Sequence, residues 1–210
     1  MNSALERIRE VRIAPVVTLP EVAHAAPLAR ALMQGGLPIA EVTFRTPAAA
    51  RGIAEMLKAC PDMLVGAGTV LTTAQVDQAV AAGAAFIVAP GFDPVIVDYC
   101  LERNIPVIPG IATASELTQA VLRKLPAVKF FPAESLGGLK TLKGLAAPFP
   151  PTNFMVTGGI SQKNMAPYLK WERILAIGGS WMVKKELLQA EDFAQISRLA
   201  AEAVRMAHER

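Results

Sequence analysis

The sequence is poor in the residues that most often build metal centres and redox sites. Among its 210 residues it has two cysteines, Cys60 and Cys100, and two histidines, His24 and His208. No C-x-x-C pair is present, so the usual zinc and dithiol motifs have no support. The histidines are too few for a multi-histidine metal site or a histidine-based triad. We therefore expect no metal and no cofactor, and we interpret both cysteines as buried or half-buried thiols.

The chain also lacks long runs of any one character. Its net charge is +3 and its basic residues are scattered, so nothing predicts nucleic-acid binding. No apolar run is long enough to span a bilayer, and the amphipathic start, MNSALERIREVR, lacks the continuous apolar core of an export signal. Hydrophobic residues make up 52% and charged residues 19%, a globular balance. We expect a cytoplasmic protein with no nucleic-acid and no membrane partner.

What the sequence does contain is a regular series of short apolar runs. Eight such segments, rich in β-branched residues, each end in glycine, threonine, proline or a charge. They are residues 14–19, 38–45, 64–70, 86–91, 106–111, 127–133, 154–159 and 174–180. Their starts lie roughly 20 to 27 residues apart, which leaves room for a strand, a helix and two short loops. The intervening segments have helical patterns, and Thr113 with Glu116 forms a possible capping box.

Eight strand–helix units in this length predict an α/β fold, a (β/α)8 barrel of the TIM type. We expect a single domain over residues 1–210, with residues 1–12 forming a short helix that precedes the barrel. An open doubly wound sheet is the alternative, because short apolar strands fit either fold. No G-x-G-x-x-G follows the first strand, which weakens the dinucleotide-binding version of that alternative.

One charged side chain interrupts the sixth predicted strand. Lys129 stands between Val128 and Phe130 in the segment AVKFFPA, where it has little freedom to reach water. Burial disfavours the ammonium form and can lower the pKa of a lysine by several units. The resulting free amine is a nucleophile toward carbonyl carbon and can form a Schiff base. A structural lysine that is ion-paired with Glu41 or another neighbour is the alternative.

The second predicted strand carries polar groups at alternate positions. Glu41, Thr43 and Arg45 in EVTFR share one face, because side chains in a strand repeat with a period of two. Buried charges need partners. Glu41 and Arg45 therefore either form an internal salt bridge at the barrel mouth or serve a ligand. In the second case Glu41 moves protons and Arg45 holds a carboxylate.

Glycines mark the ends of the last two predicted strands. TGGI at 157–160 and GGS at 178–180 expose backbone N–H groups where many barrels bind phosphate. Tight turns without a ligand are the alternative. Thr69 in GAGTV and Pro90 in APG also end strands, where a simple cap or turn is again the alternative. Together with Lys129, these segments predict a site for a phosphorylated, carbonyl-bearing anion.

Six of these segments in combination closely resemble one known family. EVTFRT, VGAGTVL, PGIAT, VKFFPAE, TGGI and IGGSW are similar, in the same order, to motifs of the 2-dehydro-3-deoxy-phosphogluconate (KDPG) aldolases. These are class I, metal-independent aldolases of the Entner–Doudoroff pathway, and the resemblance covers residues 13–183. It implies a (β/α)8 barrel, usually a homotrimer, and a phosphorylated 2-keto acid that is cleaved to pyruvate and glyceraldehyde 3-phosphate. Phe44, Ala89 and Val156 depart from common family residues but remove no reactive group.

The resemblance also implies a role for each matching residue. Lys129 is implied to form the Schiff base, Glu41 to act as general acid and base through a water, and Thr157 to position Glu41. The other implied contacts are Arg45 and Thr69 with the carboxylate, Pro90 and Phe131 with the pyruvyl group, and Gly158, Gly159, Gly179 and Ser180 with the phosphate.

Other functions remain as alternatives. Two sister specificities are 2-dehydro-3-deoxy-6-phosphogalactonate, which is the C4 epimer, and the unphosphorylated 4-hydroxy-2-oxoglutarate (KHG). A phosphate-binding barrel isomerase or epimerase would act without a covalent lysine. A non-catalytic sugar-phosphate sensor is the third class, and the presence of Lys129, Glu41 and Arg45 argues against it.

Overall fold

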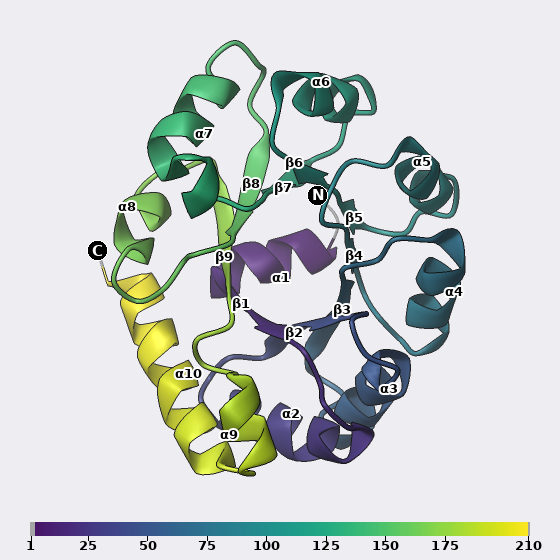
Figure 1. Ribbon diagram of the computed structural model, residues 1–210, viewed down its shortest axis with the longest axis vertical. Helices are drawn as coiled ribbons and strands as arrows, with labels where there is room; N and C mark the ends of the chain where they lie inside the picture. The colour runs from purple at the N-terminus through teal and green to yellow at the C-terminus, as the bar shows by residue number, and fades with distance from the viewer. Residues whose placement is uncertain (1–2, 210) are drawn as a thin grey trace.

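Parallel strands form the wall of a barrel, and helices cover the outside of that wall (Figure 1). The computed structural model describes residues 3–209. The strands are β1 Ile13–Val17, β2 Ile39–Thr43, β3 Leu64–Gly68, β4 Ile87–Val88, β5 Val107–Ile108, β6 Gly110–Ile111, β7 Ala127–Phe130, β8 Asn153–Thr157 and β9 Ile174–Gly179. Their order in the sheet is β5-β4-β3-β2-β1-β9-β8-β7-β6. The predicted (β/α)8 barrel is confirmed, and the open sheet is excluded.

The fifth predicted strand is divided into β5 and β6. Pro109 separates the two pieces and has no N–H to donate to a neighbouring strand. β5 pairs with β4, whereas β6 pairs with β7 through Gly110 and Lys129. The carbonyl of Pro109 still accepts a hydrogen bond from the Lys129 N–H at 2.8 Å. The segment 107–111 therefore pairs with β4 on one side and with β7 on the other, and in this way it closes the sheet into a barrel.

Ten α-helices and two short 3-10 helices are formed within residues 3–209. They are α1 Ser3–Val11, η1 Val22–His24, α2 Ala25–Gln34, α3 Ala49–Ala59, α4 Thr73–Ala81, α5 Pro94–Glu102, α6 Ala114–Leu122, η2 Glu134–Leu136, α7 Gly138–Ala146, α8 Met165–Leu169, α9 Lys185–Gln189 and α10 Phe193–His208. The predicted capping box of α6 is present: Thr113 Oγ1 accepts from the Glu116 N–H, and Glu116 accepts from the Thr113 N–H.

The helix α1 closes one end of the barrel. It lies across the middle of the barrel in Figure 1 and contacts β1 and β9. Its apolar face buries Leu5 and Ile8. Since α1 ends just before β1 begins, it covers the N-terminal ends of the strands and leaves their C-terminal ends free. The predicted helix over 1–12 is confirmed for Ser3–Val11, whereas Met1 and Asn2 lie outside the described residues.

Both cysteine thiols are free and neither forms a disulfide. Cys100 is buried and Cys60 is half-buried, as predicted. Burial raises the pKa of the Cys100 thiol to about 11, which keeps this thiol protonated and unreactive at neutral pH. Within residues 3–209, no group of three or more His, Cys, Asp and Glu side chains is arranged to hold a metal ion. Across the same residues, no helix has the length and apolarity of a membrane-spanning segment.

Buried polar side chains are few, and most of them lie on the strands. The barrel strands are buried on both faces, as is usual for a parallel sheet covered by helices. Within that apolar interior, Glu41 and Thr43 on β2, Lys129 on β7 and Thr157 on β8 are all less than one-tenth exposed. Burying such groups costs free energy unless they have partners or a function. These four residues therefore mark the part of the barrel to examine for a site.

Candidate active site

A buried lysine and a buried glutamate meet inside the barrel. Lys129 Nζ lies 3.0 Å from Glu41 Oε1. Lys129 is 5% exposed and Glu41 is fully buried. In the sheet order, β7 and β2 are separated by β8, β9 and β1, so they stand on opposite sides of the barrel. The ion pair therefore crosses the interior, and the prediction that Lys129 is shielded from solvent is confirmed.

The neighbouring strand makes room for the carboxylate. Thr43 on β2 is in register with Gly68 on β3. A Cβ atom at Gly68 would lie 2.3 Å from Glu41 Oε1, so any larger residue would displace the carboxylate. The second carboxylate oxygen, Glu41 Oε2, is buried and receives no hydrogen bond from a residue of the described chain. That oxygen therefore keeps its capacity to accept a hydrogen bond.

The polar residues of the second strand separate into three environments. Glu41 pairs with Lys129, so the alternative of an internal salt bridge between Glu41 and Arg45 is wrong. Thr43 Oγ1 donates to the carbonyl of Val17 at 2.9 Å and ties β2 to β1. Arg45 lies beyond the end of β2, is exposed, and makes no ion pair with any residue of 3–209. Its guanidinium is therefore available to a ligand.

A cavity of about 390 Å³ opens at the C-terminal ends of the strands. We call it the main cavity because most of the predicted site residues line it. The predicted site residues that line it are Arg45, Phe131, Thr157, Gly158, Gly159, Gly179 and Ser180. Lys129 Nζ lies 5.4 Å from the centre of the Phe131 ring, so the amine is located just beneath the cavity lining. The structure thus brings together most of the predicted residues at the end of the barrel where enzymes of this fold carry out their chemistry.

The two glycine turns of the cavity are packed against each other. Gly158 and Gly159 have φ angles of 103° and 77°, in the left-handed region that favours glycine. A Cβ atom at Gly178 would lie 2.2 Å from Thr157 Oγ1. The Thr157 hydroxyl is buried and has no hydrogen-bond partner among the described residues. It therefore retains its full hydrogen-bonding capacity at the cavity wall.

Two predicted binding residues lie away from this cavity lining. Pro90 follows β4 and lines a second cavity of about 330 Å³, together with Phe92 and Glu116. Thr69 follows β3 and has a φ angle of 56°, a strained left-handed conformation for a threonine. Neither residue lines the main cavity. Their predicted contacts with a carboxylate and a pyruvyl group remain predictions.

Sequence reasoning missed a contact that supports the glycine turn at 157–160. The Tyr168 hydroxyl on α8 donates to a carboxylate oxygen of Glu134. The Glu134 side chain packs against Gly159, where an added Cβ would lie 2.7 Å from Glu134 Cβ. Burial, and then the hydrogen bond to Glu134, raise the pKa of the Tyr168 hydroxyl, which keeps it a donor. No local pattern links Tyr168 to Glu134, so only the folded chain shows this contact.

Two lysines of the cavity lining were also missed. Lys184 and Lys185 follow β9 and line the main cavity beside Ser180. Their position a few residues after the GGS turn of the eighth predicted strand was a signal that could have found them. Lysines scattered along a sequence are usually solvated surface residues, so residue type alone does not distinguish Lys184 and Lys185 from the others.

The fold and this geometry define a class of enzymes. A closed barrel presents a shielded lysine, a carboxylate in contact with it, an available guanidinium and glycine turns around one cavity. A lysine in this setting can attack a carbonyl carbon, and the carboxylate can move the protons. The class is that of barrel enzymes that bind a carbonyl compound covalently at a lysine.

Comparison with known proteins identifies the family. The chain matches the sequence model of the family described as aldolase, KDPG and KHG aldolase, over residues 5–199. It is 48% identical over 206 residues to the 2-dehydro-3-deoxy-phosphogluconate aldolase of Treponema pallidum, covering 98% of each chain. The chain belongs to the KDPG and KHG aldolase family, and it is an aldolase, a carbon–carbon lyase. The family and enzyme class predicted from the sequence motifs are confirmed.

Two solved structures have the same fold. The KDPG aldolase of Zymomonas mobilis, with 3-phosphoglycerate, has a TM-score of 0.90 at 38% identity and covers 97% of this chain and 96% of its own. The KDPG aldolase of Legionella pneumophila, with pyruvate captured as a covalent carbinolamine intermediate, has a TM-score of 0.91 at 36% identity and covers 96% and 98%.

Proposed function

We propose that this chain is a class I aldolase that cleaves 2-dehydro-3-deoxy-6-phosphogluconate to pyruvate and glyceraldehyde 3-phosphate. One observation carries the proposal: Lys129 is only 5% exposed, and its Nζ lies 3.0 Å from a fully buried carboxylate next to a cavity at the strand ends. The reaction named for the T. pallidum relative supports the choice of substrate. The covalent pyruvate adduct of the L. pneumophila enzyme supports a lysine-bound intermediate.

The first half of the reaction builds an electron sink on Lys129. Glu41 accepts a proton from the Lys129 ammonium across their 3.0 Å contact, which frees the amine to attack the C2 ketone. Loss of water from the carbinolamine gives an iminium ion. A base removes the proton of the C4 hydroxyl, the C3–C4 bond breaks, and its electron pair moves toward the iminium nitrogen. Glyceraldehyde 3-phosphate departs and an enamine of pyruvate remains on Lys129.

The second half returns the enzyme to its starting state. Glu41 supplies the proton that converts the enamine carbon into a methyl group, and hydrolysis of the imine releases pyruvate. Thr157 positions the carboxylate and the water that relays its protons. The Thr157 hydroxyl suits this role because it is buried at the cavity wall and makes no hydrogen bond with a described residue.

The remaining predicted residues hold the two ends of the substrate. Arg45 binds the carboxylate next to the keto group, assisted by Thr69, and its freedom from internal ion pairs supports this role. Phe131 and Pro90 flank the pyruvyl group. The phosphate is bound by the backbone N–H groups and the hydroxyl of Gly158, Gly159, Gly179 and Ser180, all of which line the cavity.

Borohydride trapping tests the proposal. Incubation with pyruvate and sodium borohydride is expected to add the mass of one reduced pyruvyl group per chain, and peptide mass spectrometry is expected to locate it on Lys129. Lactate, which has no carbonyl group, serves as the control and should add no mass. Absence of the adduct, or an adduct on another lysine, would show that the proposed chemistry is wrong.

Substrate comparison separates the sister specificities. We expect the highest kcat/KM for 2-dehydro-3-deoxy-6-phosphogluconate, with lower values for its galactonate epimer and for 4-hydroxy-2-oxoglutarate. A reversed ranking would overturn the choice of substrate while leaving the Schiff-base chemistry in place.

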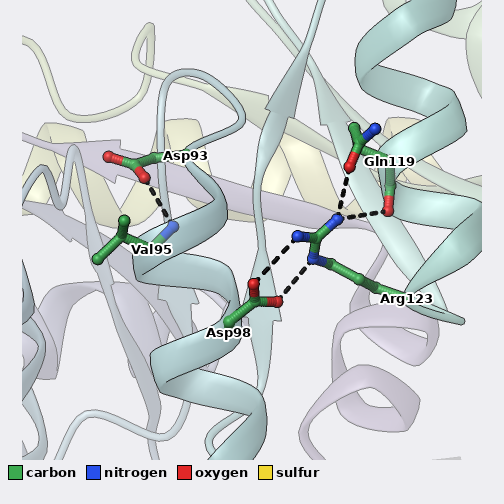
Figure 2. Close-up of polar contacts among 5 residues, drawn as sticks. All are labelled: Asp93, Val95, Asp98, Gln119 and Arg123. Carbon is green, nitrogen blue, oxygen red and sulfur yellow. Dashed lines mark hydrogen bonds and ion pairs between the residues drawn. The ribbon is translucent and has the colours of Figure 1, made fainter.

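We also propose that the chain forms a homotrimer in the cytoplasm. Five large apolar side chains that are more than one-third exposed lie on the side of the barrel formed by α4 to α6: Leu71, Val80, Val95, Leu101 and Leu122. On this face, Arg123 at the end of α6 binds Asp98 on α5 at 2.6 and 3.0 Å and links the two helices (Figure 2). The hydrogen bond to Arg123 lowers the pKa of the Asp98 carboxyl and keeps it charged. An exposed apolar face of this kind supports contacts between copies.

Measurement of the molar mass in solution tests the assembly. Val95 is 68% exposed near the start of α5, where Asp93 caps the helix by accepting from the Val95 N–H (Figure 2). We expect Val95→Asp to shift the sedimentation coefficient from that of a trimer toward that of a monomer, because a charge is disfavoured in an apolar contact. Ala201→Asp, at an exposed position on α10, should leave the trimer intact. A trimer that is unchanged by Val95→Asp would exclude this face.

A further inference from the structure

The main cavity carries more positive charge than the glycine turns and Arg45 account for. Its charged lining residues are Arg45, Lys184, Lys185 and Glu186. Arg45 follows β2, whereas the two lysines follow β9 and lie beside Ser180, next to the glycine turns. The lysines are therefore close in the chain to the turn that ends at Ser180, to which the substrate phosphate is assigned, whereas Arg45 follows a strand two places away in the sheet.

The two lysines are not neutralised by the protein. Neither Lys184 nor Lys185 forms an ion pair with a residue of 3–209, and Glu186 forms none either. Two adjacent ammonium groups repel each other when no anion lies between or near them. Backbone N–H groups of the glycine turns offer dipoles to a phosphate but no net charge. A phosphate monoester carries a charge of about −1.5 to −2 at neutral pH, which the two lysines are placed to balance.

The backbone that carries the lysines continues directly from the glycine turn at 178–180, here called the phosphate turn. Between Ser180 and Lys184, the side chains of Met182 and Val183 are buried in the core. The Val183 N–H donates to the Ser180 carbonyl at 3.1 Å, which forms a tight turn. The lysine side chains are exposed, but the backbone that carries them is therefore held in place next to the phosphate turn.

The Trp181 ring packs against the same turn. A Cβ atom at Gly179 would lie 1.8 Å from an atom of that ring, so the indole packs directly against the glycine. Trp181 and Lys184 also line a neighbouring cavity of about 540 Å³. The stretch from Gly179 to Lys185 thus forms one packed unit whose two ammonium groups extend to the mouth of the main cavity.

We propose that Lys184 and Lys185, here called the lysine pair, determine the preference of this enzyme for substrates with a terminal phosphate. The lysine pair supplies the net positive charge that balances the phosphate dianion. It therefore discriminates against the same 2-keto acid without phosphate. This inference rests on the proposed function, because it takes the aldol cleavage at Lys129 as given and assigns the substrate class of that site.

A double variant with two substrates tests the lysine pair. We expect Lys184→Ala/Lys185→Ala to lower kcat/KM for 2-dehydro-3-deoxy-6-phosphogluconate by about tenfold or more, mostly through KM, since hydrogen bonds to charged groups contribute substantially. For unphosphorylated 2-dehydro-3-deoxygluconate the change should stay within about twofold, because no dianion is lost. The charge-matched control is Lys58→Ala/Lys140→Ala, two exposed helix lysines outside the cavity, which should leave both substrates unaffected.

Salt and charge-retaining variants separate electrostatic binding from a structural role. Raising the KCl concentration should lower kcat/KM of the unaltered enzyme for the phosphorylated substrate more steeply than that of the double variant, because salt screens the interaction. Inorganic phosphate should inhibit the double variant more weakly. Lys184→Arg/Lys185→Arg keeps both charges and should retain most of the preference. A merely structural contribution would respond to none of these three changes in this way.

The outcomes distinguish this inference from the proposed function. Equal losses on both substrates, or losses of the same size in the control double variant, would overturn the role of the lysine pair. Pyruvate has no phosphate, so the borohydride adduct at Lys129 should form equally well in the double variant. An intact adduct together with an unchanged phosphate preference would reject the lysine pair and leave the aldolase in place. No adduct in the unaltered enzyme would reject the aldolase itself.

Discussion

Replacing Lys129 with methionine is expected to lower kcat for cleavage of the phosphorylated substrate by about four orders of magnitude or more, because the covalent intermediate then has no amine on which to form. Methionine is unbranched and of similar length, so it fills the same space between β7 and β2. Initial rates of pyruvate release measure the effect. Pyruvate with borohydride should add no mass to this variant. Turnover that survives in Lys129→Met would show that another residue is the nucleophile.

A second variant keeps this result interpretable if the first variant is unstable. Lys129→Met leaves Glu41 buried without its cation, and removal of one partner of a buried pair costs about 3–5 kcal/mol. Lys129→Met/Glu41→Gln removes both charges and should recover most of the free energy of unfolding, measured by denaturant or thermal unfolding. Activity should stay lost in this double variant, which separates the catalytic loss from the loss of stability.

Glu41→Gln is expected to lower kcat by about 10² to 10⁴, because glutamine keeps the shape of the carboxylate but cannot accept or return a proton. Its amide oxygen can still accept a hydrogen bond from Lys129 Nζ at the position of Oε1. The sharper measurement is exchange of the pyruvate methyl protons in D₂O, which requires protonation of the enamine. The exchange rate should fall as far as kcat, whereas the borohydride adduct with Lys129 should still accumulate, at a lower rate, because water must then take the ammonium proton.

The control for Glu41 is a neighbour on the same strand. Thr43→Val removes the hydroxyl that donates to the Val17 carbonyl, so it perturbs β2 without touching the lysine. This variant should lose stability by about 1 kcal/mol and keep most of its methyl exchange. If Glu41→Gln exchanged methyl protons at the rate of the unaltered enzyme, a group other than Glu41 would be the proton donor.

Most of the barrel could be predicted from local patterns, and the exception has a local cause. Short β-branched runs and capped helices repeat at a spacing that suits a parallel strand–helix unit, so each strand could be located from its own residues. The segment 106–111 is predicted as one strand but forms two, because Pro109 has no backbone N–H to donate to a neighbouring strand. Its carbonyl nevertheless bonds to the Lys129 N–H, so the barrel closes across the break.

The candidate site was predictable residue by residue, but the sequence did not decide which of the possible contacts would form. A lysine flanked by Val128 and Phe130 and a glutamate within β2 each stand out as charges in apolar strands. That Glu41 pairs with Lys129 rather than with the Arg45 guanidinium is decided by the barrel, since Lys129 and Glu41 are 88 positions apart in the sequence. The Tyr168 hydroxyl behind the glycine turn has no local signature at all.

The sequence by itself determined the alternation of strands and helices, the presence of a shielded lysine, and the glycine turns after β8 and β9. These features depend on neighbours within a few positions, because strand and helix periods and turn conformations are local properties. Only the tertiary structure decided that β7 faces β2 across the barrel, that Arg45 opens to the cavity, and that Lys184 and Lys185 line the same cavity as Arg45. Closure of the sheet sets the distances between residues that are remote in the chain, and no local pattern records how far around the barrel each strand lies.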